Sequence, residues 1–599
     1  MTVTSRIPAA VQSLLQKRIT VFLLSAALTL LAVSTAFRLV WPVLSAHAEL
    51  PGRPAESVEM PWQFHHASLG NKLYVELDVG LFTTRTWRII PDDDLVEITV
   101  NGTPVSLTSV RPGGLSDYTY GFEIDLTRYL WEARNKIVFY LDNHGGDGGL
   151  NMRPVLGSLR WSLIGLSFLP LLLGLAWLFR LHYTQIALLV SALVVLCCYW
   201  AATPWGMRSH DVGGGGHLEY ITYIANRHAL PNPMEGWTFY HPPLYYIAGA
   251  LTWAWAKWLA LPAPECVQGL SLALWLVFLT ASAGTLRLAL RGRPGALFAA
   301  TALVALWPSG IIHGLRIGND AAFYAAAGIA TWFMVRWWRS RRRRDVCFLS
   351  LAIAAAFLCK SNAMVLAAAA GLLLGSAVVF SITRRKAQKF KPTLADLAIF
   401  TGLTGTGFAL SFAVRVYYYL QGNIHNWFIS NIDSLGGSLS VPVDVKSFLP
   451  LDIPTFLTQP WLETGNDATG RWNFWNYLLR SSLSGEFSFP GELHRALALA
   501  WGAVLLGLCL VVVRRFVNSL ACRNIRQLYI QLPWLLLTVL WLASVAALRY
   551  KAPFACSNDF RYVLPVIVPA AFYWANGGHF TRILMCLMSI LSVVFFTTL

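Results

Sequence analysis

Residues 208 to 246 read RSHDVGGGGHLEYITYIANRHALPNPMEGWTFYHPPLYY, a polar segment set between long apolar runs. The apolar run 184 to 203 ends just before Asp211, so the chain leaves a hydrophobic environment at this carboxylate. A carboxylate where a membrane helix meets water is a candidate functional group, and the glycines from Gly213 to Gly216 leave room for a bulky ligand. The alternative is that Asp211 caps a helix beginning near His217 and the glycines form a flexible turn.

The composition excludes a soluble protein. The chain has 599 residues, of which 56% are hydrophobic and only 13% are charged. Its net charge of +17 comes from Lys and Arg clusters beside apolar runs, where basic residues orient membrane helices. We therefore predict a polytopic protein whose partner is the lipid bilayer, and no nucleic-acid partner.

The spacing of apolar runs predicts about thirteen transmembrane helices, counting an N-terminal anchor. After the anchor, the runs lie near residues 161 to 180, 184 to 203, 266 to 289, 295 to 313, 320 to 338, 345 to 359, 362 to 382, 395 to 420, 495 to 513, 528 to 547, 562 to 576 and 582 to 599. The segment 242 to 260 is also apolar. The positive-inside rule favours a helix along the outer interface for it, since a further crossing would break the agreement among the basic clusters.

Residues 1 to 45 contain a cytoplasmic N-terminus and the first anchor, an apolar run from Ile19 to Val40. The sequence Ala46-His47-Ala48 resembles a signal-peptidase site, so a cleaved signal peptide is an alternative. We favour an uncleaved anchor, because the run is longer than the usual apolar core of about 7 to 15 residues.

The composition of residues 46 to 158 differs from that of the apolar segments on either side. Segments such as KLYVELDVG and KIVFYLDN alternate apolar with polar residues, and turn signals such as Asn101-Gly102 separate them. This pattern predicts a small antiparallel β-sandwich outside the membrane. The segment resembles the galactose-binding-like jelly rolls of carbohydrate enzymes; whether it binds sugar stays open.

From residue 159 to residue 599, basic clusters fall on one predicted side and the isolated polar residues on the other. The predicted outer loops are 204 to 265, 421 to 494 and 548 to 561. Nucleotide sugars and ATP are absent outside the cytoplasm, and no phosphate-binding loop occurs in a suitable setting. A reaction on that side that needs an activated group must therefore take it from a donor that is attached to a lipid.

This organisation resembles the GT-C glycosyltransferases, polytopic enzymes that use polyprenyl-phosphate sugars. The resemblance depends on Asp211 with the later HPPLYY, on GND at Gly318 to Asp320, on the lysine in FLCKSNAM and on DFRYVLP from Asp559. It spans roughly residues 184 to 575. Two features depart from the family: Asp211 has no adjacent acid, which puts metal dependence in doubt, and no soluble domain follows the last helix.

A jelly roll between the first two helices is also similar to the layout of mycobacterial arabinosyltransferases and suits pilin arabinosyltransferases of Gram-negative bacteria. The resemblance implies an inverting transferase in a bacterial inner membrane, with its active site facing the periplasm. It would move a sugar, arabinofuranose among the candidates, from polyprenyl phosphate to a hydroxyl of an acceptor protein such as pilin, or of a glycan or lipid.

We assign Asp211 as the general base, because a positioned carboxylate can take the proton of the acceptor hydroxyl. The leaving phosphate needs cations and hydrogen-bond donors, and we assign it Lys360, Arg561 and His241. The remaining predicted substrate-binding residues are Asp320, Asn319, His217, Tyr240, Tyr245, Asp559, Tyr562 and Glu486. No cofactor is required, although Asp211 and Asp320 could share a divalent cation.

Each assignment has a structural alternative. Lys360 and Arg561 would serve equally as interface anchors, Asp320 as a helix N-cap and His241 as a packed interfacial side chain. Cys266 and Cys556 could form a disulfide on the outer face. At the level of the whole chain, the rival hypotheses are a transporter or flippase with an external sugar-binding domain, and a glycan sensor.

Overall fold

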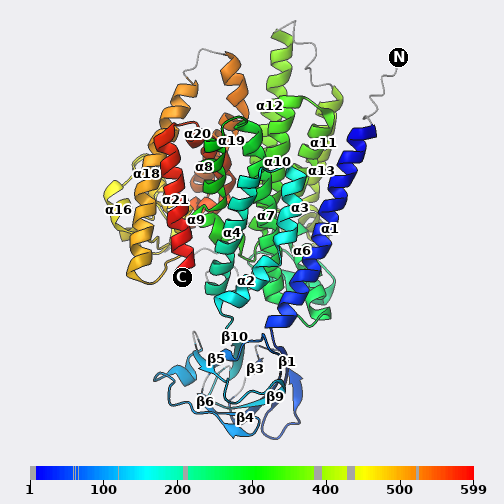
Figure 1. Cartoon of the computed structure of the whole chain (residues 1–599), viewed down its shortest axis with the longest axis vertical. Helices are drawn as coiled ribbons and strands as arrows, with labels where there is room; N and C mark the ends of the chain where they lie inside the picture. Colours follow the sequence, from blue (N-terminus) through cyan, green and yellow to red (C-terminus); the bar gives the residue numbers. More distant parts are fainter. Residues whose placement is uncertain are drawn as a thin grey trace. The chain divides into compact units, whose positions relative to one another are not determined.

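The computed structural model describes residues 9 to 599, apart from 59, 61, 65 to 66, 93, 119 to 120, 147, 207 to 213, 384 to 393, 428 to 438 and 521 to 524. The chain divides into two compact units. The sandwich unit comprises Leu28–Phe168 with Ala256–Pro262, and the helical unit comprises the chain up to Ala27 with Leu169–Trp255 and Ala263–Leu599. Figure 1 shows the course of the chain through both.

The sandwich unit contains two antiparallel sheets, as the alternating sequence predicts. The six-stranded sheet has the order β2-β1-β4-β9-β6-β7 and the four-stranded sheet the order β3-β10-β5-β8. The strands are β1 (Val43–Glu49), β2 (Glu56–Val58), β3 (Trp62–Phe64), β4 (Ser68–Val79), β5 (Thr86–Asp92), β6 (Asp94–Val100), β7 (Thr103–Pro104), β8 (Phe122–Asp125), β9 (Ala133–Asn143) and β10 (Gly148–Pro154).

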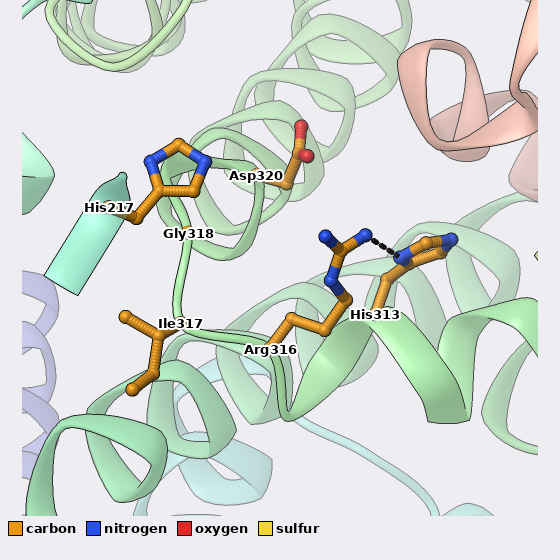
Figure 2. Close-up of a pocket in the computed structure, with 6 residues that line it drawn as sticks. All are labelled: His217, His313, Arg316, Ile317, Gly318 and Asp320. Carbon is orange, nitrogen blue, oxygen red and sulfur yellow. Dashed lines mark hydrogen bonds between the residues drawn. The ribbon is translucent and has the colours of Figure 1, made fainter. Parts of the chain in front are cut away.

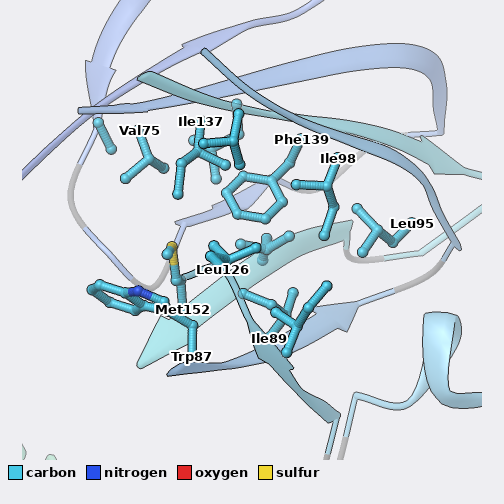
Figure 3. Close-up of a cluster of buried hydrophobic side chains, with 14 of the residues drawn as sticks. Val75, Trp87, Ile89, Leu95, Ile98, Leu126, Ile137, Phe139 and Met152 are labelled. Atoms are coloured by element: carbon cyan, nitrogen blue, oxygen red, sulfur yellow. The ribbon is translucent and has the colours of Figure 1, made fainter. Parts of the chain in front are cut away.

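The period-two pattern of the strands builds the core between the sheets. In β4 the side chains of Leu73, Val75 and Leu77 are fully buried and alternate with more exposed neighbours. They meet Trp87 of β5 and Phe139 of β9 in one apolar cluster (Figure 3). This alternation is what a sheet with one face toward a core requires.

The candidate signal-peptidase site lies inside a paired strand. Ala46, His47 and Ala48 belong to β1, which pairs with β2 on one side and with β4 on the other. The preceding helix α1 (Ala9–Val40) contains an apolar span of 25 residues, Gln16–Val40. Cleavage after Ala48 would remove nearly all of a strand from the interior of the sheet, which supports the uncleaved anchor.

The rest of the described chain is mostly helical. The helices are α2 (Ser158–Leu166), α3 (Leu169–Phe179), α4 (Tyr183–Ala202), α5 (His217–Arg227), α6 (Leu244–Trp258), α7 (Ala263–Ala289), α8 (Pro294–Ala305), α9 (Pro308–Gly314), α10 (Asn319–Ser340), α11 (Arg343–Phe357), α12 (Ala363–Thr383), α13 (Leu394–Leu410), α14 (Ala413–Leu420), α15 (Val445–Phe448), α16 (Ile453–Thr458), α17 (Phe474–Ser484), α18 (Glu492–Leu520), α19 (Ile525–Lys551), α20 (Ile567–Ala575) and α21 (His579–Thr597). Near α10 pack α7, α11 and α12 (Figure 1).

Several predicted spans are single helices, but others are broken. Among the described residues, six helices are long and apolar enough to cross a membrane, and up to nine spans result if each bent pair counts as one. The predicted span 295 to 313 is α8 followed by α9, bent by 48° where Pro308 starts the second helix. The predicted span 395 to 420 is α13 and α14, also bent by 48°. The total of thirteen crossings stays a prediction, as does the interfacial position of α6.

Close helix packing positions the segment after α9. A Cβ on Gly314 would lie 2.7 Å from the ring of Trp275, and one on Gly310 would lie 2.8 Å from it. Because both positions lack a side chain, α9 can pack directly against Trp275 of α7. The residues that follow α9 are thereby held beside the start of α10.

The possible disulfide between Cys266 and Cys556 does not form. Cys266 is buried and Cys556 half-buried, and both are free thiols in the described part of the chain. The proposal that they pair across the outer face is therefore wrong, and both act as small apolar side chains.

Candidate functional site

Two buried ion pairs lie where helices of the helical unit begin and end. Lys360, between α11 and α12, pairs with Asp320 in the first turn of α10. Arg561 Nε lies 3.0 Å from Asp559 Oδ2 in the turns between α19 and α20. The side chains of these residues are 9%, 14%, 13% and 1% exposed, so water screens neither pair well.

The aromatic ring of Tyr562 joins the two pairs. Lys360 Nζ lies 4.8 Å from the ring centroid and the Arg561 guanidinium 5.1 Å. Arg561 also donates to the Tyr562 hydroxyl over 3.3 Å. The Tyr562 ring therefore links the two ion pairs into one cluster, since each cation interacts with the ring's negative face. Residues about 200 positions apart in the sequence thus lie side by side.

Side-chain to backbone hydrogen bonds fix these elements to one another. Asn319 Nδ2 donates to the Cys359 carbonyl over 2.9 Å, and Asn362 Nδ2 donates to the Tyr562 carbonyl over 2.8 Å. The Tyr324 hydroxyl donates to the Arg561 carbonyl over 2.6 Å. Asn319 therefore holds the start of α10 against the backbone beside Lys360.

The geometry of Asp320 and Lys360 does not fit their structural alternatives. The N-cap of α10 is Gly318, so Asp320 is not the cap, and its carboxylate binds Lys360 instead. Lys360 is 7% exposed, which does not fit a side chain that reaches to the interface as an anchor.

Glu486 brings a third carboxylate to the cluster. It follows α17 and accepts a hydrogen bond from the Tyr477 hydroxyl. Burial, reinforced by the neighbouring Glu486, raises the pKa of Asp559 to about 7, although Arg561 opposes the shift. A carboxyl group with a pKa near neutrality, next to a buried arginine, is typical of a functional site.

A small pocket opens beside the first ion pair (Figure 2). It is lined by His217, His313, Arg316, Ile317, Gly318 and Asp320. Figure 2 shows His217 on one side and His313 on the other, with Arg316 and Asp320 between them. Arg316 Nη1 lies 3.4 Å from His313 Nδ1, and its guanidinium lies over the ring of Phe487.

The predicted residues near the HPPLYY motif form a group of stacked rings beside Gly318. His217 Nδ1 bonds to the Tyr246 hydroxyl over 2.7 Å, and the His241 ring stacks parallel to it at 5.9 Å. Tyr240 packs on His241 in turn.

Tyr245 supports the backbone of the pocket. Its hydroxyl accepts from the Gly318 N–H over 3.0 Å and bonds to Ser271 Oγ over 3.0 Å. Of the residues around the HPPLYY motif, His217 lines the pocket, whereas His241 lies one ring behind it.

Asp211 lies outside the described residues. It precedes His217 by six residues, which span at most about 20 Å when extended. Its role as base stays a prediction, and so does a shared cation with Asp320. Among the residues that the structure describes, no group of three or more His, Cys, Asp or Glu side chains is arranged to hold a metal ion.

Sequence reasoning missed Arg316, His313 and Tyr477. Arg316 and His313 belong to the run HGLRIGND, and their signal was a cation and a histidine just before the GND motif. Tyr477 had no local signal, because its partner Glu486 is fixed only by the end of α17.

The cluster and the basic stretches lie at opposite helix ends. Helix α10 begins at the site with Asn319 and ends near Arg341 to Arg344, and α11 runs back from these arginines to Lys360. Helix α19 begins near Arg526 and leads to Asp559. Since basic residues favour the cytoplasmic side, the charge pattern favours the other side for the site.

An apolar cavity of about 400 Å³ lies between α6, α7, α10 and α11. Its lining is almost entirely apolar: Leu244, Tyr245, Ala248, Leu274, Ala322, Ala325, Ala326, Ile329, Phe333, Phe348, Leu351, Ala352, Ala355 and Cys359. Because Cys359 directly precedes Lys360, one end of this cavity adjoins the ion-pair cluster.

The fold and the site define a multi-pass membrane protein with buried charges at its helix ends. Residues 264 to 404 match the family described as dolichyl-phosphate-mannose-protein mannosyltransferase. This segment runs from the start of α7 into α13 and includes Arg316, Asp320 and Lys360. Over this segment the chain is therefore similar to a family of glycosyltransferases.

Two solved structures show weak likeness to the chain. One is ArnT from Cupriavidus metallidurans bound to undecaprenyl phosphate, with 16% identity, a TM-score of 0.30, and coverage of 68% of this chain and 77% of that chain. The other is the arabinosyltransferase EmbB from Mycobacterium smegmatis, with 12% identity, a TM-score of 0.30, and coverage of 97% and 64%. No curated protein matches the sequence.

Proposed function

We propose that the protein transfers a sugar from a polyprenyl-phosphate donor to an acceptor hydroxyl on the outer side of a bacterial inner membrane. The observation that carries the proposal is that Cys359, which lines the apolar cavity, directly precedes Lys360 of the cluster. A polyprenyl chain is apolar and carries its phosphate at one end. A lipid chain in this cavity would bring that phosphate to Lys360 and Arg561.

The cations suit the chemistry of the leaving group. The acceptor oxygen forms a bond to the anomeric carbon as the bond from that carbon to the phosphate oxygen breaks. The phosphodiester thereby becomes a monoester and gains one negative charge, which Lys360 and Arg561 would stabilise. Asp211 takes the proton of the acceptor hydroxyl, and attack from the face opposite phosphate inverts the anomeric centre.

The identity of donor sugar and acceptor is the finer part of the proposal. Arabinofuranose is the first donor sugar to assay, because a sandwich after the first anchor resembles the arabinosyltransferase layout. The acceptors to assay with it are a pilin-like protein and a cell-envelope glycan or lipid.

The test is transfer by the purified full chain in lipid nanodiscs, with radiolabelled polyprenyl-phosphate sugars and these acceptors. We expect a labelled product. We also expect Lys360→Gln to lower the rate at least about a hundredfold, because one of the cations that stabilise the leaving phosphate is lost. Glu463→Gln is the matched control, because that carboxylate is exposed and far in sequence from the cluster. A donor that crosses the bilayer and stays intact would instead support the flippase alternative.

Cavity variants test the lipid path separately. Ala355→Trp places a large ring in the apolar cavity and should weaken donor binding at least about tenfold. Cys347→Trp on the same helix is the matched control, since Cys347 is half-buried like Ala355 but does not line the cavity. Equal effects of the two variants would contradict the proposed position of the lipid chain.

A further inference from the structure

A buried histidine beside the pocket has one ring nitrogen without a partner. His313, on α9, is 2% exposed. Its Nδ1 lies 3.4 Å from Arg316 Nη1, which can only donate, so Nδ1 is the acceptor and the proton of the neutral ring sits on Nε2. This Nε2–H has no hydrogen-bond partner among the described residues.

The unpartnered nitrogen faces the turn that ends α17. His313 Nε2 lies 3.6 Å from the position that a Cβ on Gly485 would occupy. Ser484, next to Gly485, is 1% exposed, and its Oγ also lacks a hydrogen-bond partner within the described part of the chain. Two buried polar groups without partners therefore lie at a turn where Gly485, with φ of +64°, contributes no side chain.

Such groups are costly unless something binds them. A buried donor or acceptor left unsatisfied costs about 1–3 kcal/mol, and native structures rarely leave one without a reason. A ligand hydroxyl satisfies both groups, because its oxygen accepts from His313 Nε2–H while its proton is donated to Ser484 Oγ. Glu486 and Phe487 follow directly and add a carboxylate and an aromatic ring to the same turn, both of them side-chain types that are suited to sugars.

The position of His313 in the pocket indicates which substrate group it meets. His217, six residues after the proposed base Asp211, lies at one side of the pocket, and His313 lies at the other (Figure 2). The sugar to be transferred is bonded to the phosphate, so in the proposed reaction it lies next to the cations, among which His313 contacts Arg316.

We propose that His313 and Ser484 recognise a hydroxyl of the sugar carried by the donor and thereby select a hydroxylated sugar. This inference rests on the proposed function. His313 has a second task, since its Nδ1 holds the Arg316 guanidinium in the pocket.

Paired substitutions separate the two nitrogens. His313→Asn keeps an acceptor near the position of Nδ1 and loses the group at Nε2, whereas His313→Gln keeps an amide donor near Nε2 and loses the acceptor at Nδ1. Binding to the full chain in nanodiscs is measured with two probes: bare undecaprenyl phosphate, and undecaprenyl phosphate bearing arabinofuranose, mannose or glucose.

We expect the wild type to bind at least one sugar-bearing lipid more tightly than the bare lipid phosphate. His313→Asn and Ser484→Ala should lose about tenfold in affinity for that lipid and stay within about twofold for the bare one, while His313→Gln keeps most of the discrimination. Lys360→Gln should weaken both lipids alike.

Three results would overturn the inference. The first is equal weakening of both lipids by His313→Asn, the second is no weakening of either, and the third is a wild type that does not distinguish sugar-bearing from bare lipid. In all three, binding of bare lipid phosphate that depends on Lys360 leaves the proposed function standing. A wild type that binds none of these lipids contradicts the proposed function itself.

Discussion

The sandwich unit and the helical unit bury different kinds of side chain. The core between the sheets is apolar, and a buried amide such as Asn135 is fully bonded: it donates to the carbonyls of Trp131 and Ala133 and accepts from the Trp131 N–H. The helical unit instead buries whole charges, with Lys360 on Asp320 and Arg561 on Asp559.

This difference separates stability from function. A sheet can be stabilised by burying alternate apolar residues, and its sequence pattern then describes most of its structure. A buried ion pair is weak evidence for stability, because desolvation of the charges offsets their attraction. Two such pairs around one tyrosine ring therefore indicate a requirement other than stability, and binding of an anion is what the cations suit best.

The largest expected effect removes the proposed base. Asp211→Asn keeps the size of the side chain but cannot accept the acceptor's proton, so kcat should fall by about a hundredfold to ten-thousandfold. Donor binding should be nearly unchanged, because the amide leaves Lys360 and Arg561 in place. Transfer at the full rate would contradict the base assignment even if the enzyme class held.

The second test breaks one buried pair. Asp320→Ala leaves the Lys360 ammonium buried without its carboxylate, which should cost about 3–5 kcal/mol. Replacing both partners, as in Asp320→Ala with Lys360→Met, should recover much of that loss and still abolish transfer. Thermal unfolding of the three proteins in one detergent measures the difference. A double variant no more stable than the single one would contradict a compensated pair.

The convergence of the cluster could be predicted from sequence for a physical reason. Asn319, Asp320, Lys360, Asp559 and Arg561 each stand at the end of an apolar run, and the basic clusters fix which ends lie together. The two sheets could be predicted equally well, since period-two alternation is a local property.

Features that depend on packing could not be predicted in this way. The break before α9 has a local signal in Pro308, whereas the break between α13 and α14 occurs at Ser411 and Phe412, without a proline. The stacking of His241 on His217 depends on how two separate segments pack together. The pairing of Tyr477 with Glu486 depends on where α17 ends.

A smaller effect is expected from pH. The pKa of Asp559, near 7, is set by burial and by the charged groups around it, namely Glu486, Arg561 and Arg316. As the pH falls through 7, Asp559 takes up a proton and neutralises Arg561 less. The sugar-bearing donor, a phosphodiester of constant charge in this range, should then bind roughly threefold more tightly at pH 6 than at pH 8. Asp559→Asn should remove this dependence, and a pH profile unchanged by that substitution would contradict the assignment.

The smallest effect is expected from an ion pair of the sandwich unit. Arg88 and Glu123 pair across β5 and β8, but their side chains are 39% and 46% exposed, against 9% and 14% for Lys360 and Asp320. Arg88→Gln should therefore change the free energy of unfolding by only a few tenths of a kcal/mol, about the median for exposed pairs, and less at high salt. Thermal unfolding at low and high salt measures this change beside Asp320→Ala. If the exposed pair cost as much to break as the buried one, burial would not be what distinguishes the ion pairs of the two units.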